Sequence, residues 1–517
     1  MSKGEIVYLL YQKDFVEKDG DRYFIYEGSI FSEVTSDYVV NLEAFIVTHD
    51  YWLISSSLYK KHGKLPNNVI DITLLSRLVA GKKDNSGDTK SWDISNTIKP
   101  LYADQHDFDQ YMSMYYRRMV LNVDSYMLFA HKLAEYADLI FDRAHEVGEL
   151  NRFYDLEVPL YNILSKVACR GICISNDILK THKANIKYDY YRELKKFAEK
   201  HNVFYEEPSE AGIKDKLRLL GYHVENYEID FLIDFLPSID GYTYDLRKLQ
   251  KLNKSYRVFN SISSEEKKLR PITDTHATST SRIYFKSPNI QNISKKYRNI
   301  FISEDNFKLS YIDYDQFEVG IMAALSGDST MKNFYTNMDA YIDLSKKIFG
   351  NDNYRKESKI LFLSYTYGMS MKNILSSVRQ QMGDVESAKS YFAGFNTFEQ
   401  WKEKIFEEFE KESRISSLCG NYLNRTQKGK LTNKEKRSAV SQVVQGTGSY
   451  IFKSALLELS KQEGVEILIP MHDAVLIQHL STYDPAEAVN IFENTMTNIL
   501  KNNIKGKASI EDFYQTP

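Results

Sequence analysis

Two aspartates, each close behind an apolar strand-like segment, constrain this chain more than any other feature. Asp313 follows KLSYI, and Asp473 lies between ILIPM and AVLIQ, at the expected tip of a hairpin. Both carboxylates would therefore lie at the edge of a buried sheet. Two-metal phosphoryl transfer requires such a pair, because two Mg²⁺ ions ~3.5–4 Å apart stabilise the attacking and leaving oxygens. Aspartate also favours strand–turn junctions, so the pair alone leaves a purely structural role open.

A helix expected over residues 353–367 carries two cations on one face. Arg355, Lys359, Leu363 and Tyr367 follow one another at intervals of four. Four residues rotate by about 400° around the axis of an α-helix, so each side chain is displaced by only roughly 40° from the one before it and the four lie on one stripe. A triphosphate at the N-terminal end would meet both cations and a favourable helix dipole. The apolar end would then be placed to pack against a base. A solvated Arg/Lys pair on a half-buried helix would show the same spacing.

Further segments of the same region give these features a context. The five elements are Thr280-Ser-Arg282 with Pro288-Asn-Ile-Gln-Asn292, Asp313-Tyr-Asp-Gln-Phe-Glu318, Arg355-x3-Lys359-x7-Tyr367-Gly368, Arg437-x7-Gln445-Gly-Thr447 and His472-Asp473. In order and spacing they resemble the motifs of family A DNA polymerases, the bacterial DNA polymerase I family. The resemblance is clear over residues 270–478, weaker over 150–269 and poor over 1–145.

This resemblance implies an α+β right-hand polymerase fold with palm, fingers and thumb, preceded by an α/β RNase H-like exonuclease-type domain. The expected domains are residues 1–148 for a degenerate 3′–5′ exonuclease-like domain, 149–268 for the thumb, 269–338 for the first part of the palm, 339–434 for the fingers and 435–517 for the second part of the palm.

The resemblance also implies a role for each matching residue at the reaction centre. Asp313 and Asp473 would bind two catalytic Mg²⁺ ions, for which Mn²⁺ would be able to substitute, with the Tyr314 carbonyl as a further ligand. Arg355 and Lys359 would bind the triphosphate. Lys359 is in addition a candidate catalytic residue that donates a proton to the departing pyrophosphate.

Other residues would select the nucleotide. Tyr367 would stack near the templating position or gate the new pair, and Glu318 would clash with a ribose 2′-OH and so reject ribonucleotides. Gln316, Leu363 and Tyr341 complete the expected nucleotide site.

The DNA would be held by a third group. Arg282 and Gln445 would contact the minor-groove side of the primer–template end, where hydrogen-bond acceptors occur on every base pair. His472 would brace the primer terminus. The remaining expected DNA contacts are Asn289, Gln291, Asn292, Lys296, Arg298 and Arg437.

Several positions depart from the family's pattern. Ala474 stands where the family has an acidic residue after the His-Asp pair, and Asp315 stands where it has a serine. Leu363 replaces an aromatic that faces the sugar, which bears on discrimination against dideoxynucleotides. The other departures are Tyr284–Phe285 for small hydroxyl residues, Ser441 for an asparagine and Tyr341 for a phosphate-contacting histidine. None removes an expected metal ligand, so we expect activity.

The N-terminal third lacks the signature of a proofreading nuclease. That chemistry needs a D-x-E motif on the first strand, and residues 1–150 contain none. We therefore expect a degenerate domain; an active nuclease with unusual ligands and an unrelated accessory domain are the alternatives. Along the chain, strands are expected at 6–11, 23–26, 44–48, 308–312, 465–469 and 475–478, and helices at 69–80, 111–145, 158–168, 177–200, 244–259, 316–325 and 353–367.

Composition sets few limits on partners. The 67 Lys and Arg nearly balance 70 Asp and Glu, so any phosphate-binding surface must be local. Three cysteines cannot form a disulfide framework or a Cys-only zinc site, which favours a reducing, cytosolic setting. No apolar run reaches the ~18–20 residues that span a bilayer, and the apolar stretch of MSKGEIVYLLYQKD is too short for a signal peptide.

The sequence thus predicts a cytoplasmic, monomeric DNA-directed DNA polymerase that acts on primer–template DNA and dNTPs without proofreading, in replication or repair. Its small size favours a bacteriophage source, and hence the host cytoplasm. Two alternatives remain. One is a single-subunit RNA polymerase of related fold, against which Glu318 argues. The other is a non-catalytic nucleic-acid-binding protein on a polymerase scaffold, which Ala474 and Tyr341 favour.

Overall fold

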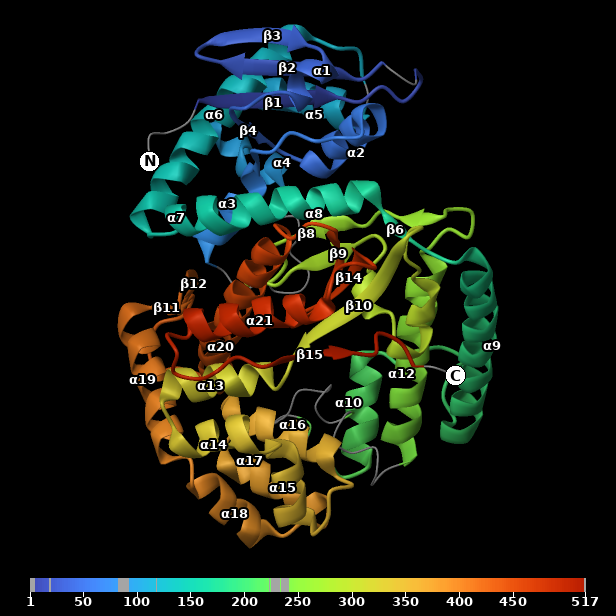
Figure 1. The fold of residues 1–517 in the computed structure, drawn as a ribbon, viewed down its shortest axis with the longest axis vertical. Helices are drawn as coiled ribbons and strands as arrows, with labels where there is room; N and C mark the ends of the chain where they lie inside the picture. Colours follow the sequence, from blue (N-terminus) through green and yellow to red (C-terminus); the bar gives the residue numbers. More distant parts are fainter. Residues whose placement is uncertain are drawn as a thin grey trace.

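The computed structural model describes residues 5–17, 20–81, 93–117, 119–222, 224, 233 and 241–515. Buried apolar side chains form two cores within these parts of the chain. The smaller joins side chains between Val7 and Tyr161, and the larger joins side chains between Leu160 and Phe513. The N-terminal unit around the smaller core lies at the top of Figure 1, above the rest of the chain.

A mixed five-stranded sheet organises the N-terminal unit. In spatial order its strands are β3 (Ile30–Val34), β2 (Arg22–Glu27), β1 (Ile6–Gln12), β4 (Phe45–Thr48) and β5 (Val69–Asp71). The first three are antiparallel neighbours, whereas β4 runs parallel to both β1 and β5. This is the arrangement expected of an RNase H-like α/β domain. The helices are α1 (Ser36–Val40), α2 (Tyr51–His62), α3 (Ile72–Ala80), α4 (Ile94–Thr97), η2 (Lys99–Leu101), α5 (Gln105–Arg117), α6 (Val123–Glu146) and α7 (Leu150–Arg152).

The helix expected over residues 69–80 begins only at Ile72, so this prediction was wrong for its first turn. The three residues before it form β5, because their backbone pairs with β4. Asp71 then caps α3 by accepting a hydrogen bond from the Thr73 amide. A capping side chain at the end of a strand marks where the helix can begin.

The helix expected over residues 111–145 is two helices, α5 and α6. Asn122 caps α6 through its side chain, which accepts a hydrogen bond from the Asp124 amide. The cap starts a new helix where periodicity alone indicated a continuous one. The other expected strands and helices are confirmed to within three residues at either end.

A second, four-stranded antiparallel sheet lies in the larger core. In spatial order its strands are β13 (Val465–Pro470), β14 (Ala474–Leu480), β10 (Phe307–Tyr314) and β15 (Ala508–Glu511). Asp313 on β10 is paired with Ala474 on one side and with Ser509 on the other. Directly paired residues share a face of the sheet, so these three positions form a row across it.

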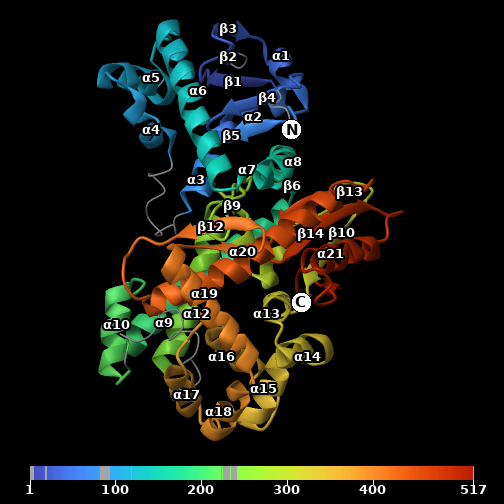
Figure 2. The same cartoon turned by 90° about the vertical axis from the view of Figure 1, so that its left-hand side faces the viewer.

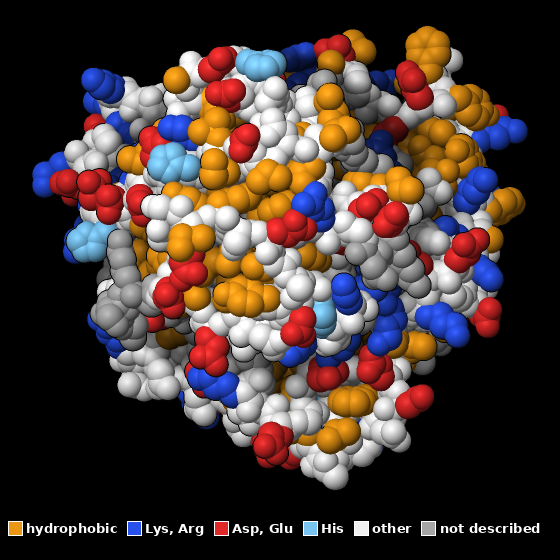
Figure 3. All heavy atoms as spheres, turned by 90° about the horizontal axis from the view of Figure 1, so that it is seen from above, with side chains coloured by type: hydrophobic (Ala, Val, Ile, Leu, Met, Phe, Trp, Pro, Cys, Tyr) orange, Lys and Arg blue, Asp and Glu red, His pale blue; other side chains and the backbone are white. Residues whose placement is uncertain are grey.

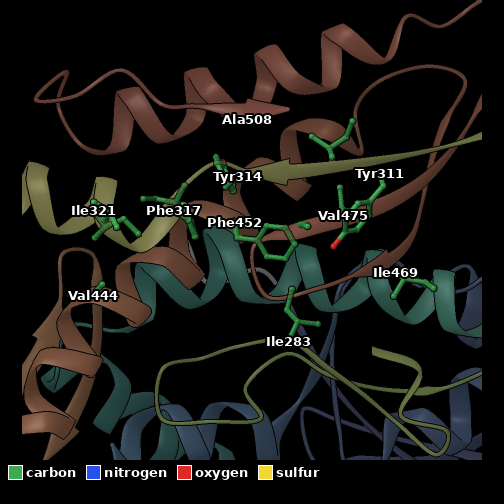
Figure 4. Close-up of a cluster of buried hydrophobic side chains, with 14 of the residues drawn as sticks. Ile283, Tyr311, Tyr314, Phe317, Ile321, Val444, Phe452, Ile469, Val475 and Ala508 are labelled. Carbon is green, nitrogen blue, oxygen red and sulfur yellow. The ribbon is translucent and has the colours of Figure 1, made fainter. Parts of the chain in front are cut away.

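Packing fixes which face of β10 carries Asp313. Successive side chains of a strand point to opposite faces, and Tyr314 is buried, with its ring stacked on Phe317 at a centroid distance of 4.3 Å. The Tyr314 hydroxyl also donates to the Phe492 carbonyl at 3.0 Å. Figure 4 shows Tyr314 and Phe317 in the apolar cluster that includes Phe452. A slip of one residue would exchange the two faces, so this packing keeps Asp313 on the opposite one.

Helices α8 (Val158–Arg170), α20 (Asn433–Leu459) and α21 (Pro485–Ile499) pack against strands of this sheet. The helices that directly follow β10 gather at the end of the molecule farthest from the N-terminal unit, with α9 and α12 beside them (Figures 1 and 2). The first set is α13 (Phe317–Ser326), α14 (Ser329–Asn337), α15 (Ala340–Phe349), α16 (Arg355–Thr366), α17 (Met371–Gln380), α18 (Val385–Ala393) and α19 (Asn396–Glu412). After the hairpin of β11 (Arg414–Ser417) and β12 (Gly420–Asn424), the chain returns through α20 and α21.

The segment between the two sheets contains a separate helical layer and a hairpin. Its elements are η3 (Phe153–Glu157), α8 (Val158–Arg170), β6 (Ile172–Cys173), α9 (Asn176–His201), α10 (Glu210–Leu219), α12 (Gly241–Asn260), β7 (Lys268–Leu269), β8 (Ile272–Asp274), β9 (Tyr284–Lys286), η5 (Ile290–Asn292) and η6 (Lys295–Ile300). The two long helices α9 and α12 pack on each other, and Tyr190 stacks on Tyr256 between them at 5.1 Å.

The surface of the N-terminal unit mixes apolar and charged side chains. Figure 3, which looks down on this unit, shows the two kinds interspersed. Its exposed large apolar residues include Phe15, Val16, Ile30, Tyr38 and Trp52. None of the helices in the described parts of the chain combines the length and the apolar character that crossing a lipid bilayer requires.

A buried group of charged side chains joins the two cores. Glu157 is fully buried and accepts hydrogen bonds from Lys453 Nζ at 2.8 Å and from Arg152 Nη1 at 2.7 Å. Ser281 also donates to it at 3.2 Å, and His276 contacts Ser281 through Nδ1 at 3.0 Å. Removing charges from water is unfavourable, so each member of such a group depends on its partners.

The buried ring of His276 predicts a dependence of stability on pH. Its pKa is lowered to about 3, first because burial disfavours the charged ring and then because Arg77 and Lys453 are close. An unfolded histidine has a pKa of about 6.5. The unfolded state therefore binds an extra proton between these values, and the folded state loses stability as pH falls below about 6.5.

We expect this single group to lower the free energy of unfolding by about 1.4 kcal/mol between pH 7.5 and pH 5.5. Urea titrations of the wild type and of His276→Asn at both pH values measure the difference, and the variant should lack this contribution. The exposed His106 gives the matched control, since His106→Asn should keep the wild-type dependence. Equal pH dependence in wild type and His276→Asn would contradict the assignment.

Candidate active site

Asp313 and Asp473 meet at the edge of the four-stranded sheet that is formed by strand ends, where β10 finishes and β14 begins. The Tyr314 amide donates to the Asp473 carbonyl at 3.1 Å, and Asp313 is paired with Ala474, the residue that follows Asp473. The structure therefore brings together two carboxylates that lie 160 positions apart in the sequence. Their use as metal ligands stays a prediction.

Burial and nearby negative charge act on both groups. The pKa of Asp313 is raised to about 7, first by partial burial and then by the charges of Asp473, Glu511 and Asp315. Asp473 keeps contact with solvent, yet the protein packed around it also raises its pKa, and Glu318 adds to the effect. A cation between them would relieve this repulsion.

The other acidic side chains near the pair are partly engaged elsewhere. Asp315 accepts a hydrogen bond from Ser509 Oγ at 2.8 Å, and Glu511 lies 3.8 Å from Lys295 Nζ. Among the described residues, no three His, Cys, Asp or Glu side chains gather closely enough to hold a metal ion by themselves. Water or substrate oxygens would therefore have to complete the coordination of any ion.

The two predicted phosphate-binding cations share one aromatic ring. Arg355 and Lys359 on α16 place their charged groups 5.5 and 5.6 Å from the centroid of Tyr341 on α15. Lys359 also acts electrostatically on Asp313 and Asp473, lowering the pKa of each against the rise from burial. Lys359 therefore lies within electrostatic reach of both carboxylates. Leu363, on the same stripe of α16, is partly buried.

Arg355 already has an anionic partner. Its Nε and Nη2 donate to Asp339 Oδ2 at 3.1 and 2.7 Å. The other oxygen of Asp339 caps α15 by accepting from the amides of Tyr341 and Ile342. A triphosphate that binds Arg355 must share it with this carboxylate or displace it. Sequence reasoning missed Asp339, although an aspartate directly before an apolar helix is an N-cap signal.

Glu318 is the centre of a hydrogen-bond network from four segments. Its carboxylate accepts from Arg282 Nη2 at 3.1 Å and from Gln445 Nε2 at 3.3 Å. Gln445 also donates to the Tyr367 hydroxyl at 3.4 Å and accepts from Ser441 Oγ at 3.0 Å. The structure thus brings four of the predicted nucleotide and DNA contacts into one cluster.

His472 lies at the same edge as Asp473 and packs against Tyr284, with a ring-centroid distance of 5.1 Å. The residue keeps contact with solvent, yet its pKa is lowered to about 4, first because the protein packed around the ring disfavours its charged form and then by Arg282 and Lys254. The ring is therefore neutral near pH 7 and can accept as well as donate a hydrogen bond.

Three predicted ligand contacts are engaged within the protein. Gln291 donates to the carbonyls of Ile283 and Pro470 and accepts from the Phe285 amide. Gln316 donates to the Met338 carbonyl at 3.3 Å, and Arg298 donates to the Ile293 carbonyl at 3.0 Å. These bonds favour a positioning role; contact with DNA or nucleotide stays a prediction for each of them.

The remaining predicted DNA contacts surround the hairpin and α20. Asn289 directly precedes η5 and Asn292 is its last residue, and Lys296 lies on η6 over the Tyr297 ring. Arg437 on α20 lies beside Gly368, which follows the C-cap residue of α16. All four retain some solvent exposure.

The fold is of the right-hand polymerase type. The structure matches that of the "POL domain of Pol1 from M. smegmatis complex with DNA primer-template and dNTP" with a TM-score of 0.74 and 16% sequence identity, over 98% of this chain and 95% of that one. The likeness at this identity concerns the fold alone.

The sequence model of DNA polymerase family A matches residues 221–511, and the chain belongs to this family. It is 30% identical over 237 residues to DNA polymerase theta of Caenorhabditis elegans, covering 43% of this chain and 14% of that protein. It is 24% identical over 412 residues to DNA polymerase I of Deinococcus radiodurans, covering 72% of this chain and 42% of that protein. The chain spans less than half the length of these curated relatives.

Proposed function

We propose that this protein is a DNA-directed DNA polymerase, which adds dNTPs to a primer 3′-OH on a DNA template and releases pyrophosphate. The observation that carries the proposal is the meeting of Asp313 and Asp473 at a sheet edge that Lys359 of α16 faces. We further propose that it works as a cytoplasmic monomer in DNA replication or repair, in the host cell if a bacteriophage encodes it.

Primer extension tests this function. The purified protein, a labelled primer–template, the four dNTPs and Mg²⁺ should give products that lengthen one nucleotide at a time. No extension with Mg²⁺ or Mn²⁺, but retained DNA binding, would favour a non-catalytic nucleic-acid-binding protein. Extension with NTPs in preference to dNTPs would instead favour a single-subunit RNA polymerase.

The acidic edge fits two divalent ions, Mg²⁺ with Mn²⁺ as a substitute. Asp313, Asp473 and the Tyr314 carbonyl would hold them, and the raised pKa of both carboxylates supports this, because a bound cation would favour their charged forms. When bound, the ions would stabilise the attacking and leaving oxygens during nucleotidyl transfer.

The chain's own residues would bind and orient the nucleotide. Arg355 and Lys359 would hold the triphosphate, with Arg355 giving up part of its pairing with Asp339. Lys359 would carry the proton that the departing pyrophosphate takes up. Movement of α16 onto a correct pair would assemble the site, as in other induced-fit enzymes.

DNA would lie along the edge that carries His472, Arg282 and Gln445. We assign residues 269–338 and 435–517 to the palm, 339–434 to the fingers and 149–268 to the thumb, on the basis of the sheet, the helices after β10 and the pair α9 and α12. Positively charged side chains of these elements would contact phosphates without reading sequence.

Glu318→Ala should relax discrimination against ribonucleotides. The carboxylate would exclude the ribose 2′-OH by its volume, so its removal should raise the incorporation of NTP relative to dNTP by about 10- to 100-fold. Single-nucleotide incorporation of a matched dNTP and NTP measures the ratio.

Glu318→Gln provides the matched control, because it keeps the volume of the side chain and removes its charge. It should retain most of the discrimination. Both variants lose charge-assisted bonds to Arg282 and Gln445, so absolute rates should fall in both. An unchanged ratio in Glu318→Ala would show that another residue faces the sugar.

We also propose that the N-terminal unit has no proofreading activity. Its first strand, IVYLLYQ, carries no acidic residue. The polar side chains nearby are used in packing: His49 contacts the Tyr111 hydroxyl at 3.0 Å, and Asp50 accepts from Tyr116 at 2.9 Å.

A primer with a 3′ mismatch should therefore be neither shortened nor corrected. Gel analysis of a 5′-labelled mismatched primer, with Mg²⁺ and then with Mn²⁺, should show no products shorter than the primer in the absence of dNTPs. Metal-dependent shortening that Asp50→Asn abolishes would identify an active nuclease in this unit.

A further inference from the structure

The N-terminal unit makes a charged contact with the hairpin that carries Arg282. Arg77 on α3 donates from Nη1 and Nη2 to the two oxygens of Asp274 on β8, both at 3.0 Å. Asp274 is buried, and Lys286 on β9 donates to it as well, at 2.5 Å. Burial alone would raise the pKa of Asp274, but Arg77 and Lys286 outweigh it and hold that pKa well below its usual range.

Asp274 stands at the base of the loop that ends at Arg282. It is paired with Tyr284 across the two strands, and its Oδ1 accepts from the His276 amide at 3.0 Å, at the first turn of the loop. The loop closes through a hydrogen bond from the Ala277 amide to the Arg282 carbonyl at 3.2 Å. If Asp274 moves, Arg282 should therefore move with it, because one short closed segment joins the two residues.

The opposite side of the loop is anchored to the polymerase core. The Ser279 carbonyl accepts from Asn421 Nδ2 and Gln442 Nε2, and the Ser281 carbonyl accepts from Ser449 Oγ. Ser281 itself has a positive φ of 60°, a backbone conformation that is unfavourable for a residue with a side chain. The surrounding bonds must hold it there, and the Arg282 side chain then points at Glu318.

A second contact ties the end of α3 to the same region. The Asn424 amide donates to the Gly81 carbonyl at 2.6 Å, and its side chain donates to the Ala80 carbonyl at 2.9 Å. Gly81 has a φ of +54°, and a Cβ there would lie 2.8 Å from the Tyr422 carbonyl oxygen. The backbones of the two units thus approach each other more closely than other residues would allow.

We propose that Arg77 is a positioning residue for the primer–template contact: through Asp274, the N-terminal unit braces the 275–283 loop and so aims Arg282. The inference deepens the proposed function and rests on it for the role of Arg282 in binding DNA. It gives the N-terminal unit a task that needs no nuclease chemistry.

The test compares Arg77→Met with a matched variant of the same unit. Arg22 forms a two-bond pair with Glu33 on the sheet, away from the hairpin and more exposed to solvent than the Arg77–Asp274 pair. Arg22→Met therefore removes an Arg–carboxylate pair of the same unit without touching the brace. Amide hydrogen exchange over residues 275–283, primer–template affinity by fluorescence anisotropy, and steady-state KM values for DNA and for dNTP are measured in the holoenzyme with Mg²⁺.

We expect Arg77→Met to speed exchange in 275–283 and to weaken primer–template binding by about 3- to 10-fold, with an unchanged KM for dNTP. Arg77→Lys, which keeps the charge, should recover part of the affinity. Arg22→Met should match wild type in all readouts. Should Arg77→Met fail to fold, Arg77→Lys and Arg77→Gln are compared with Arg22→Met in the same way.

Two results would overturn the proposal. One is exchange and DNA affinity in Arg77→Met that equal those of Arg22→Met. The other is faster exchange throughout the N-terminal unit with equal losses for DNA and dNTP, which would indicate a merely structural role. If the wild type extends no primer, the proposed function fails, whereas exchange over 275–283 still decides whether Arg77 braces the loop.

Discussion

Asp473→Asn is expected to slow primer extension by about 10³-fold or more while leaving primer–template affinity nearly unchanged. The substitution keeps the shape of the side chain and removes one of the two charges that would hold the metal ions. Charge stabilisation of the reacting oxygens commonly contributes this much to catalysis. Single-turnover extension measures the rate, and fluorescence anisotropy measures the affinity. Asp313→Asn should behave in the same way.

Asp315→Asn is the matched control for this prediction. It removes an acidic charge two residues from Asp313, but its carboxylate is bonded to Ser509 and is not an expected ligand. We expect less than about a tenfold loss of rate. A near wild-type rate in Asp473→Asn, or an equal loss of rate in Asp315→Asn, would show that Asp313 and Asp473 are not the catalytic metal ligands.

Lys453→Met is expected to lower the free energy of unfolding by about 3–5 kcal/mol, because it leaves the buried carboxylate of Glu157 without its main partner. Lys453 and Glu157 are both almost completely buried and share two bonds of 2.8 Å. The pKa of Glu157 is lowered to about 2, since Lys453 and Arg152 outweigh the effect of burial. Urea unfolding at pH 7 measures the loss.

Lys461→Met removes a similar Lys–Glu pair just beyond the same helix. That pair, with Glu458, is exposed to solvent, so its loss should change stability little. The double variant Lys453→Met with Glu157→Gln should recover part of the loss, because no uncompensated charge then remains. Equal free energies of unfolding for Lys453→Met and Lys461→Met would mean that the buried pair does not stabilise the folded protein.

The parts of the fold that follow local rules could be predicted from the sequence. The apolar runs just before Asp313 and Asp473 indicated two strands. The helical spacing of apolar residues over 177–200 and 244–259 indicated two long helices. The first turn expected at 69–71 was wrong because pairing with β4 overrode the local pattern, as tertiary contacts often do.

The candidate site likewise has one part that local sequence patterns predict and another that they do not. The carboxylates and the stripe of α16 are local patterns, so they could be identified one by one and then joined by their resemblance to a family. Contacts between distant segments leave no such pattern. Glu511 reaches the face of Asp313 only through the register of β15, and the pairing of Arg77 with Asp274 crosses 197 positions. Neither could be predicted from periodicity or spacing.

The position of β15 in the four-stranded sheet has a consequence for biosynthesis. Tyr311 pairs with Glu511, and 200 positions separate them. A ribosome that adds about 5–20 residues per second needs about 10–40 s to reach the partner strand. Until β14 has been made, neither side of β10 has a strand to pair with, and the side that β15 will cover stays open for the whole interval, so its backbone groups are open to wrong partners. Nascent chains of this protein should therefore depend on chaperones until translation has passed residue 511.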